Sequence, residues 1–327
     1  MKNKFLRVTV KTVATILAIL FFLLFMIFVG EKVFFARFFL NSDIEMKVPG
    51  LKDAYVPQGF DYIDDRNIFL ACGYMSDGTA SRIYIMNENG KVVDYASMKE
   101  TDGSDHKGHT GGIAHFGNYI YVSDDKGCDV FLLSDLLDGD GKVTKCAEVV
   151  TGNNPAYCKV FDGKLYAGEF FYEKGGYNTP DSHKLITPAL DKNTAIITVF
   201  ELDAATGLAK SDIPVAVYST TSKVQGMTMS RDGKIMLSTS WGTTVSHLYV
   251  YNTGVASEST FNYKGTEVPL IYLDSKCLVD DVRMPPMAEE IIYLDGEVYV
   301  MNESACKKYL FGNLTSGRYI YAYDLDD

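Results

Sequence analysis

The sequence repeats a strand–turn–strand pattern, and polar residues that could bind a ligand or take part in catalysis occur at two fixed positions of each copy. The clearest copy, Val224–Ser240, has an apolar run, an Asp232–Gly233 turn and a second apolar run, which is the pattern of a β-hairpin. Four further copies follow the same plan. The positions around the first run hold Gln58, His109, Asn154, Gln225 and Glu289, and those after the second run hold Asp124, Glu169, Trp241 and Glu303.

Two kinds of chemistry are open to these residues if they meet. Amide, imidazole, indole and carboxyl groups can hold a small polar molecule, and this predicts a ligand set of Gln58, His109, Asn154, Gln225, Trp241 and Glu289. The carboxylates of Asp124, Glu169 and Glu303 suit a hard divalent cation such as calcium. A bound cation would activate a water for hydrolysis, and His109 could act as a ligand or general base.

The repeat predicts an all-β fold, a β-propeller of five four-stranded blades. Copies recur every 45 to 70 residues, roughly the period of propeller blades with added loops. The expected strands are 59–62, 68–71, 82–86 and 92–96; 112–115, 119–123, 129–133 and 147–150; 157–161, 165–171, 195–202 and 214–219; 226–230, 235–240, 247–251 and 269–273; and 290–294, 298–303 and 318–325.

The fifth blade lacks a strand of its own, and we expect residues 44–48 near the N-terminus to supply it and close the ring. Closure removes an open sheet edge. A count of six blades stays open if residues 173–192 or 257–266 contain further strands. In a propeller, inner strands start and second strands end on one face, so the nine candidate residues should surround the axis there.

The N-terminal segment predicts a membrane anchor. Residues 1–11 are basic, residues 12–30 are free of charge and long enough to cross a bilayer, and residues 31–42 form an aromatic and basic collar. Basic flanks stay in the cytoplasm, so residues 43–327 are expected outside the cell membrane as an extracytoplasmic propeller. An uncleaved anchor is favoured over a signal peptide because no small-residue cleavage site follows.

Charge and cysteine content exclude some functions. The net charge is −11, and residues 1–37 contribute +5, so the propeller is strongly acidic and is not expected to bind nucleic acid. None of the six cysteines forms a C-x-x-C pair, and buried free thiols are expected.

His106 and His109 have a spacing that can chelate a metal, but a solvated loop is favoured. His115 is expected to be a packed side chain, and Asp61 lies within an inner strand.

Parts of the repeat resemble exported bacterial propellers of the YncE-like and quinoprotein-dehydrogenase-like superfamily. The resemblance rests on His109–Ile113 with Tyr119–Asp124, on Val224–Gly226 with Ile235–Ser240, and on Pro285–Glu290 with Asn302–Ser304. It covers residues 50–327 and implies the propeller fold, with no reaction or quinone ligand to carry over. Glu290 departs from the pattern, which has glycine there.

Three hypotheses describe the function. The first is a membrane-anchored module that binds a small molecule, glycan or other envelope component at the polar axial face. The second is a metal-assisted hydrolase of the lactonase or glycosidase type that uses the carboxylates of that face. The third is a scaffold that docks a protein through its outer strands or the 173–192 loop.

Overall fold

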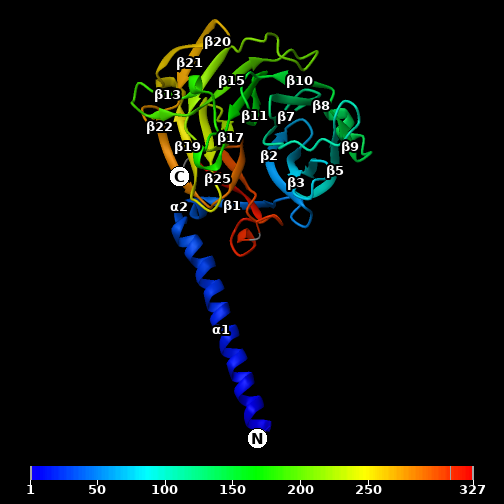
Figure 1. The fold of residues 1–327 in the computed structure, drawn as a ribbon, viewed down its shortest axis with the longest axis vertical. Coiled ribbons are helices and arrows are strands. Elements are labelled where there is room, and N and C mark those ends of the chain that lie inside the picture. Colours follow the sequence, from blue (N-terminus) through cyan, green and yellow to red (C-terminus); the bar gives the residue numbers. More distant parts are fainter. Residues whose placement is uncertain (1, 310, 326–327) are drawn as a thin grey trace.

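The computed structural model describes residues 2–309 and 311–325, which form one long helix attached to a β-propeller (Figure 1). Helix α1 spans Lys2–Phe34 and a short helix α2 spans Ala36–Leu40. The blades radiate from a common centre, and α1 leaves from the rim beside β1 and α2 (Figure 1). The all-β body that the repeat predicts is confirmed.

Five sheets of four to six strands form the blades. From the axis outward, the first blade has β2 (Tyr55–Ile63), β3 (Ile68–Met75), β4 (Arg82–Asn87), β5 (Val92–Lys99) and β9 (Lys142–Thr144), and the second has β6 (Ile113–Phe116), β7 (Tyr119–Asp124), β8 (Gly127–Leu132) and β10 (Ala147–Val150). The third blade has β11 (Pro155–Phe161), β12 (Lys164–Glu169), β15 (Ala195–Glu201), β16 (Ala216–Thr220), β21 (Thr266–Tyr272) and β20 (Glu258–Tyr263). The fourth blade has β17 (Val224–Met229), β18 (Lys234–Thr239), β19 (Ser246–Asn252) and β22 (Leu278–Met284), and the fifth has β23 (Ala288–Leu294), β24 (Glu297–Asn302), β25 (Tyr319–Asp324) and β1 (Ser42–Lys47). A five-residue helix, α3 (Leu133–Leu137), follows β8.

The N-terminal strand closes the ring as predicted. Strand β1 pairs antiparallel with β25 and becomes the outer strand of the fifth blade. Phe38, just before β1, is fully buried and stacks on Tyr323 with ring centroids 5.8 Å apart. The pairing covers the edge that β25 would otherwise expose, so residues from both ends of the chain hold one blade together.

The outer strand of the fourth blade is not where the sequence placed it. Residues 269–272 belong to β21, which pairs with β20 and, in parallel, with β16 of the third blade. The fourth blade is completed by β22 instead. The β20–β21 hairpin joins the third blade because Phe261, Tyr263 and Leu270 pack into the cluster around Phe200.

Neither of the two segments that could have held the strands of a sixth blade forms such a blade. Residues 257–266 contain β20, which extends the third blade. Residues 173–192 contain the 3-10 helices Glu173–Gly175 and Asp181–His183 and most of a two-stranded hairpin, β13 (Leu185–Ile186) with β14 (Lys192–Asn193).

Repeated glycines let neighbouring inner strands approach each other near the axis. A Cβ atom on Gly59 would lie 2.5 Å from the backbone nitrogen of Ile113, and one on Gly112 would lie 2.5 Å from that of Cys158. On Gly226 it would lie 2.5 Å from Glu290 Oε1. Glycine is therefore required at these positions of the repeat, because a larger side chain would clash with the neighbouring inner strand at the narrow centre of the ring.

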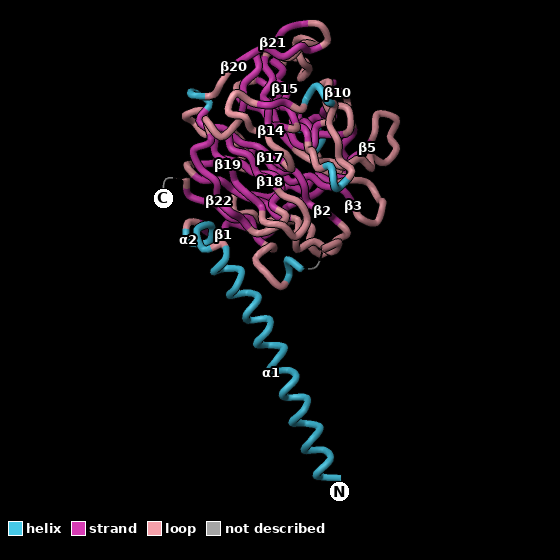
Figure 2. Tube along the Cα trace, turned by 60° about the vertical axis from the view of Figure 1, so that its left-hand side comes forward, coloured by secondary structure: helices cyan, strands magenta, loops and turns pink. Residues whose placement is uncertain are grey.

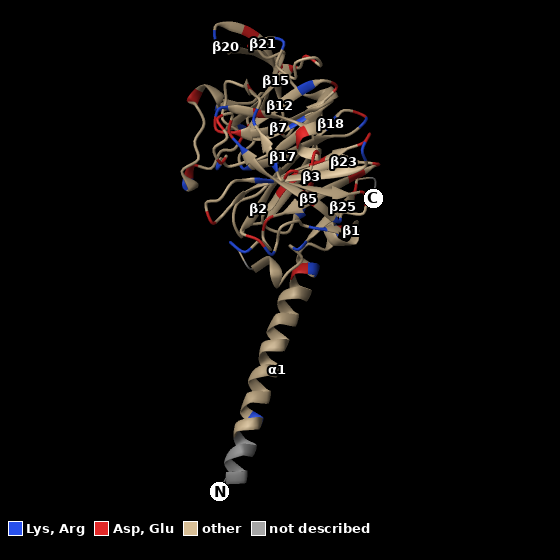
Figure 3. Ribbon diagram, turned by 90° about the vertical axis from the view of Figure 1, so that its right-hand side faces the viewer, with Lys and Arg blue, Asp and Glu red and all other residues tan. Residues whose placement is uncertain are grey.

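The end of α1 is fixed to the propeller by polar contacts. The Glu31 carboxylate accepts hydrogen bonds from the backbone nitrogen and hydroxyl of Ser316, both at 2.9 Å. Arg37 forms a two-pronged ion pair with Asp280. Thr9–Phe34 is long and apolar enough to cross a membrane. Figures 2 and 3 show this helix projecting clear of the body, and Figure 3 shows that its middle is free of charged residues.

All six cysteines are free, as expected. Five are buried and Cys146 is exposed, so the expectation of burial fails only for Cys146.

Candidate functional site

A cavity of about 380 Å³ opens on the face where the inner strands begin, and we call it the axial cavity. Seven of the nine residues singled out from the sequence line it: Gln58, His109, Asp124, Asn154, Gln225, Trp241 and Glu303. Glu289 lies directly behind the lining and is 2% exposed. Further walls come from Tyr74, Asp125, Phe170, Tyr177, Lys308 and Tyr309.

Irregularities in the inner strands lie at the residues that reach the axial cavity. The pairing of β2 with β3 shifts between Pro57 and Gly59, at Gln58. That of β17 with β18 shifts around Gln225 in the same way. In β23 the shift falls between Ala288 and Ile291, at Glu289 and Glu290. A β-bulge turns a side chain out of the regular alternation, so these bulges account for polar residues at the axis of apolar strands.

Two glutamates meet at the base of the axial cavity. Gln58 Nε2 donates to Glu303 Oε2 at 2.9 Å, and Gln225 Nε2 donates to Glu289 Oε1 at 3.3 Å. The carboxyl groups of Glu289 and Glu303 also share a hydrogen bond. Burial raises the pKa of Glu303 to about 7, and burial together with the charge of Glu303 raises that of Glu289 well above its usual value. The pair therefore holds a proton near neutral pH.

A lysine and two tyrosines lie next to this pair. Lys308 Nζ donates to the Tyr74 hydroxyl at 2.6 Å. Burial alone would lower the pKa of Lys308, but hydrogen bonds to Tyr74 and Tyr309 raise it. Its positive charge in turn favours the ionised form of Glu303. Lys308 lies in an irregular segment after β24, where no periodic pattern in the sequence marked it.

Aromatic rings form another part of the wall of the axial cavity. Trp241, the only tryptophan of the chain, lies 6.0 Å from Phe170, 4.6 Å from Tyr172 and 5.6 Å from Tyr177 between ring centroids. Tyr177 comes from the 173–192 loop, so this loop helps to build the axial cavity. The scaffold hypothesis assigns this loop to protein docking, whereas the structure places part of it in the lining of the axial cavity.

His109 and Asp124 occupy the side of the axial cavity formed by the second blade. The His109 ring meets Tyr74 edge-on at 4.9 Å, and burial lowers the pKa of His109 in spite of the nearby Asp124 charge. Asp124 Oδ1 is buried and has no hydrogen-bond partner among the described residues. A neutral imidazole has one donor and one acceptor nitrogen, so His109 can bind a polar ligand in either role.

Glu169 does not line the axial cavity with the other predicted metal ligands. Its carboxylate is 1% exposed and accepts hydrogen bonds from His183 Nδ1 at 2.9 Å and from the backbone nitrogen of Ile196 at 3.1 Å. His183 comes from the 173–192 loop, whose path the sequence did not indicate. Asp124 and Glu303 line the axial cavity without it.

Glu290, the departure from the repeat, is buried in the wall between two inner strands. Its Oε1 accepts hydrogen bonds from the backbone nitrogens of Met227 at 3.0 Å and Ile291 at 3.3 Å. Burial raises its pKa to about 8, although Lys159 counteracts this. The carboxyl group binds backbone donors here and does not line the axial cavity.

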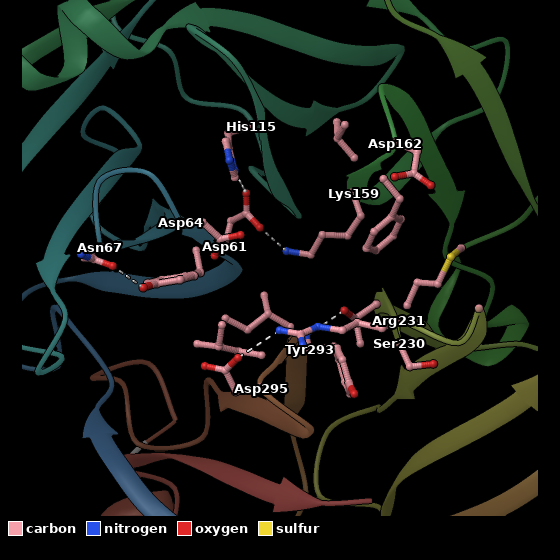
Figure 4. A pocket seen from close by; sticks show the side chains of 18 residues that line it. Asp61, Asp64, Asn67, His115, Lys159, Asp162, Ser230, Arg231, Tyr293 and Asp295 are labelled. Atoms are coloured by element: carbon pink, nitrogen blue, oxygen red, sulfur yellow. Dashed lines mark hydrogen bonds and ion pairs between the residues drawn. The ribbon is translucent and has the colours of Figure 1, made fainter.

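A second, wider cavity of about 890 Å³ lies where the inner strands end, on the opposite face (Figure 4). Asp61 accepts from Lys159 Nζ at 3.3 Å and contacts His115 Nδ1 at 2.8 Å. Lys159 is 3% exposed and also donates to the backbone oxygens of Phe60 and Ile113. A signal for this trio is present in the sequence, because charged or polar residues interrupt apolar inner strands at all three positions.

No protein-family model matches the sequence, and no curated protein matches it. Among solved structures, the chain is similar to a glutaminyl cyclase of Myxococcus xanthus, with 10% identity, a TM-score of 0.44, and coverage of 86% of this chain and 94% of that chain. It is also similar to a PQQ-bound aldose sugar dehydrogenase of Streptomyces coelicolor, with 15% identity, a TM-score of 0.44, and coverage of 80% and 78%. A calcium-binding regucalcin of Agrobacterium tumefaciens has 11% identity, a TM-score of 0.41, and coverage of 86% and 92%.

These identities are 15% or lower, so the likeness concerns the arrangement of the blades alone. The superfamily named in the resemblance stays a prediction. The five blades themselves follow from the sheet order of this chain.

Proposed function

We propose that this chain is a membrane-anchored propeller that binds a sugar-like small molecule in the axial cavity. The observation that carries the proposal is the pairing of an aromatic wall around Trp241 with the amide-held carboxyl pair of Glu289 and Glu303. Sugars present apolar C–H faces and hydroxyl edges, which suit rings on one side and hydrogen-bonding groups on the other. The volume of about 380 Å³ is within the range of small-ligand sites.

The proposed site binds neutral ligands better than anionic ones. Glu289 and Glu303 together retain a proton near neutral pH, and they still carry negative charge beside Asp124 and Asp125. Lys308 supplies one positive charge in the lining of the axial cavity. We therefore expect neutral or amino sugars to bind, and uronic acids to be rejected by like charge.

The N-terminal helix would hold the propeller at a membrane. Thr9–Phe34 has the length and composition of a span, and the residues before it are basic. By the positive-inside rule the N-terminus stays in the cytoplasm and the propeller lies on the outer side. An envelope glycan is then a ligand of the right class and location.

Hydrolysis is a second candidate, favoured by the pKa of about 7 at Glu303. A carboxyl group with that pKa can give or take a proton at neutral pH. Because Glu289 and Glu303 share a hydrogen bond, they lie closer than the two carboxyl groups of glycosidases, which need about 5 Å or more between them. A calcium-assisted version would use Asp124 and Glu303, without Glu169.

Titration calorimetry of the full chain in detergent, with neutral, amino and acidic monosaccharides and disaccharides, tests the binding proposal. We expect at least one neutral or amino sugar to bind, and Trp241→Ala to weaken it about tenfold or more. Tyr95→Ala is the matched control, because Tyr95 is a partly exposed ring on β5 outside the axial cavity. Equal loss in both variants, or binding unchanged in Trp241→Ala, would refute the assignment.

A further inference from the structure

Three side chains with metal-binding atoms meet at the junction of the first and second blades. Glu100 follows β5, His106 lies in the loop before β6, and Asp129 lies in β8. His106 Nδ1 is 2.7 Å from Glu100 Oε1 and 3.6 Å from Asp129 Oδ2. One ligand atom from each residue lies within 4.8 Å of the others. Ligands bound at about 2.0–2.2 Å around one ion have comparable separations.

Two of the three residues, His106 and Asp129, are buried, and one of the candidate ligand atoms has no hydrogen-bond partner among the described residues. His106 is 1% exposed and Asp129 is 3% exposed, which contradicts the expectation of a solvated His106. Asp129 Oδ1 forms an ion pair with Lys145 Nζ at 2.5 Å. Asp129 Oδ2, which faces His106 Nδ1, has no hydrogen-bond partner among the described residues. An unpaired carboxylate oxygen at this depth is costly unless something else binds it.

The net negative charge of the residues around this cluster also favours the binding of a cation. Lys145 is shared between Asp129 and Glu148, and Glu100 adds a third carboxylate. With a neutral imidazole, the group of Glu100, Asp129, Glu148 and Lys145 carries a net charge of −2. A single divalent ion would neutralise it.

We propose that Glu100 Oε1, His106 Nδ1 and Asp129 Oδ2 bind one divalent transition-metal ion such as Zn²⁺ or Mn²⁺. An imidazole nitrogen beside two carboxylates suits these ions, whereas calcium prefers an all-oxygen shell. Glu100 is 37% exposed at its side chain, which gives the ion a path from solvent and room for a water ligand. This inference does not depend on the sugar-binding proposal.

The other edge of the imidazole connects the proposed metal to the axial cavity. With Nδ1 on the ion, Nε2 carries the proton, and it has no partner among the described residues. A Cβ on Gly108 would lie 2.8 Å from His106 Nε2 and 2.8 Å from both carboxylate oxygens of Asp124. The Asp124 carboxylate therefore lies on the side of the ring that carries this free edge, and carboxylates that do not themselves bind the metal commonly orient metal-binding histidines.

Metal analysis of the full, tag-free chain in detergent tests the site, with zinc chloride and manganese chloride as the probes. We expect one equivalent of at least one of these ions to bind and to raise the melting temperature, and we expect EDTA to reverse the rise. His106→Gln should abolish the binding. Glu100→Gln, which changes a half-exposed side chain, should weaken it about 10-fold or more.

His247→Gln is the control, because His247 Nδ1 contacts a single carboxylate, that of Asp281, at 2.6 Å. It should keep the wild-type stoichiometry. If His106→Gln does not fold, Glu100→Gln decides, with circular dichroism confirming its fold. Absence of a bound ion in the wild type, or equal stoichiometry and affinity in Glu100→Gln, would overturn the proposal.

Discussion

Glu289 and Glu303 are the residues whose chemistry is most altered by the fold. Both are nearly fully buried, and each carboxyl group receives one amide hydrogen bond and shares another with its neighbour. Two carboxylates in contact cannot both ionise cheaply, so the pair keeps a proton to a pH well above the usual range. Because ionisation is opposed in the folded state, stability should depend on pH.

Glu303→Gln should make the free energy of unfolding less sensitive to rising pH. The pKa of Glu303 is about 7 in the fold and near 4.5 when unfolded, so its protonated form stabilises the fold below pH 4.5, and this contribution is lost as the pH rises through 7. The loss amounts to about 3 kcal/mol. Urea unfolding at pH 4.5 to 8 should show a steep fall for the wild type and a shallower one for the variant.

Glu88→Gln, an exposed carboxyl, is the control and should follow the wild type. A Glu303→Gln variant that loses stability with pH as steeply as the wild type would show that the pair does not hold the proton.

The sequence placed most of the candidate residues correctly, because strand ends can be read from turns and alternation. Gln58, Gln225 and Glu303 were assigned to the axis on this basis, and they line the axial cavity. It could not show that Glu169 faces His183, because that contact depends on the path of a long loop. Nor could it mark Lys308, which lies in an irregular segment.

The inner strands position the site through bulges and through small residues next to them. In β17 the bulge at Gln225 is followed by Gly226, which packs against the bulge of β23 at Glu290. The repeat predicted these strands well, whereas the outer strands were harder. Residues 269–273 have the alternation of a blade strand, but alternation does not say which sheet a strand joins.

Gly226→Ala should destabilise the protein and weaken ligand binding together. Its Cβ would lie 2.5 Å from Glu290 Oε1 and 2.7 Å from the Glu290 Cα, so β23 must move. We expect a loss of about 1–3 kcal/mol in the free energy of unfolding, measured by urea denaturation.

Gly254→Ala is the matched control, since its Cβ would meet only the side-chain oxygen of Asn252, at 3.2 Å. It should cost less than about 0.5 kcal/mol. Equal stability of the two variants would mean that the close approach of the inner strands does not constrain the fold.

The complete molecule combines a closed ring with a long helix attached at its rim. Strand β1 closes the ring, and Glu31 of α1 and Arg37 of α2 bind the rim through polar contacts (Figure 1). If α1 spans a bilayer, both axial faces stand to the side of the membrane and remain open to solutes. This arrangement leaves the proposed ligand site in the axial cavity accessible to small molecules.

Intrinsic fluorescence of the full chain tests ligand binding at the axial cavity most directly, because the only tryptophan, Trp241, lines it. We predict that neutral or amino sugars which bind will shift or quench the emission saturably and protect Trp241 from acrylamide. Glu303→Gln should weaken this response, and Glu88→Gln should leave it intact. A sugar that binds by calorimetry without changing the emission or quenching of Trp241, or the absence of any response across the sugar panel, would contradict the account.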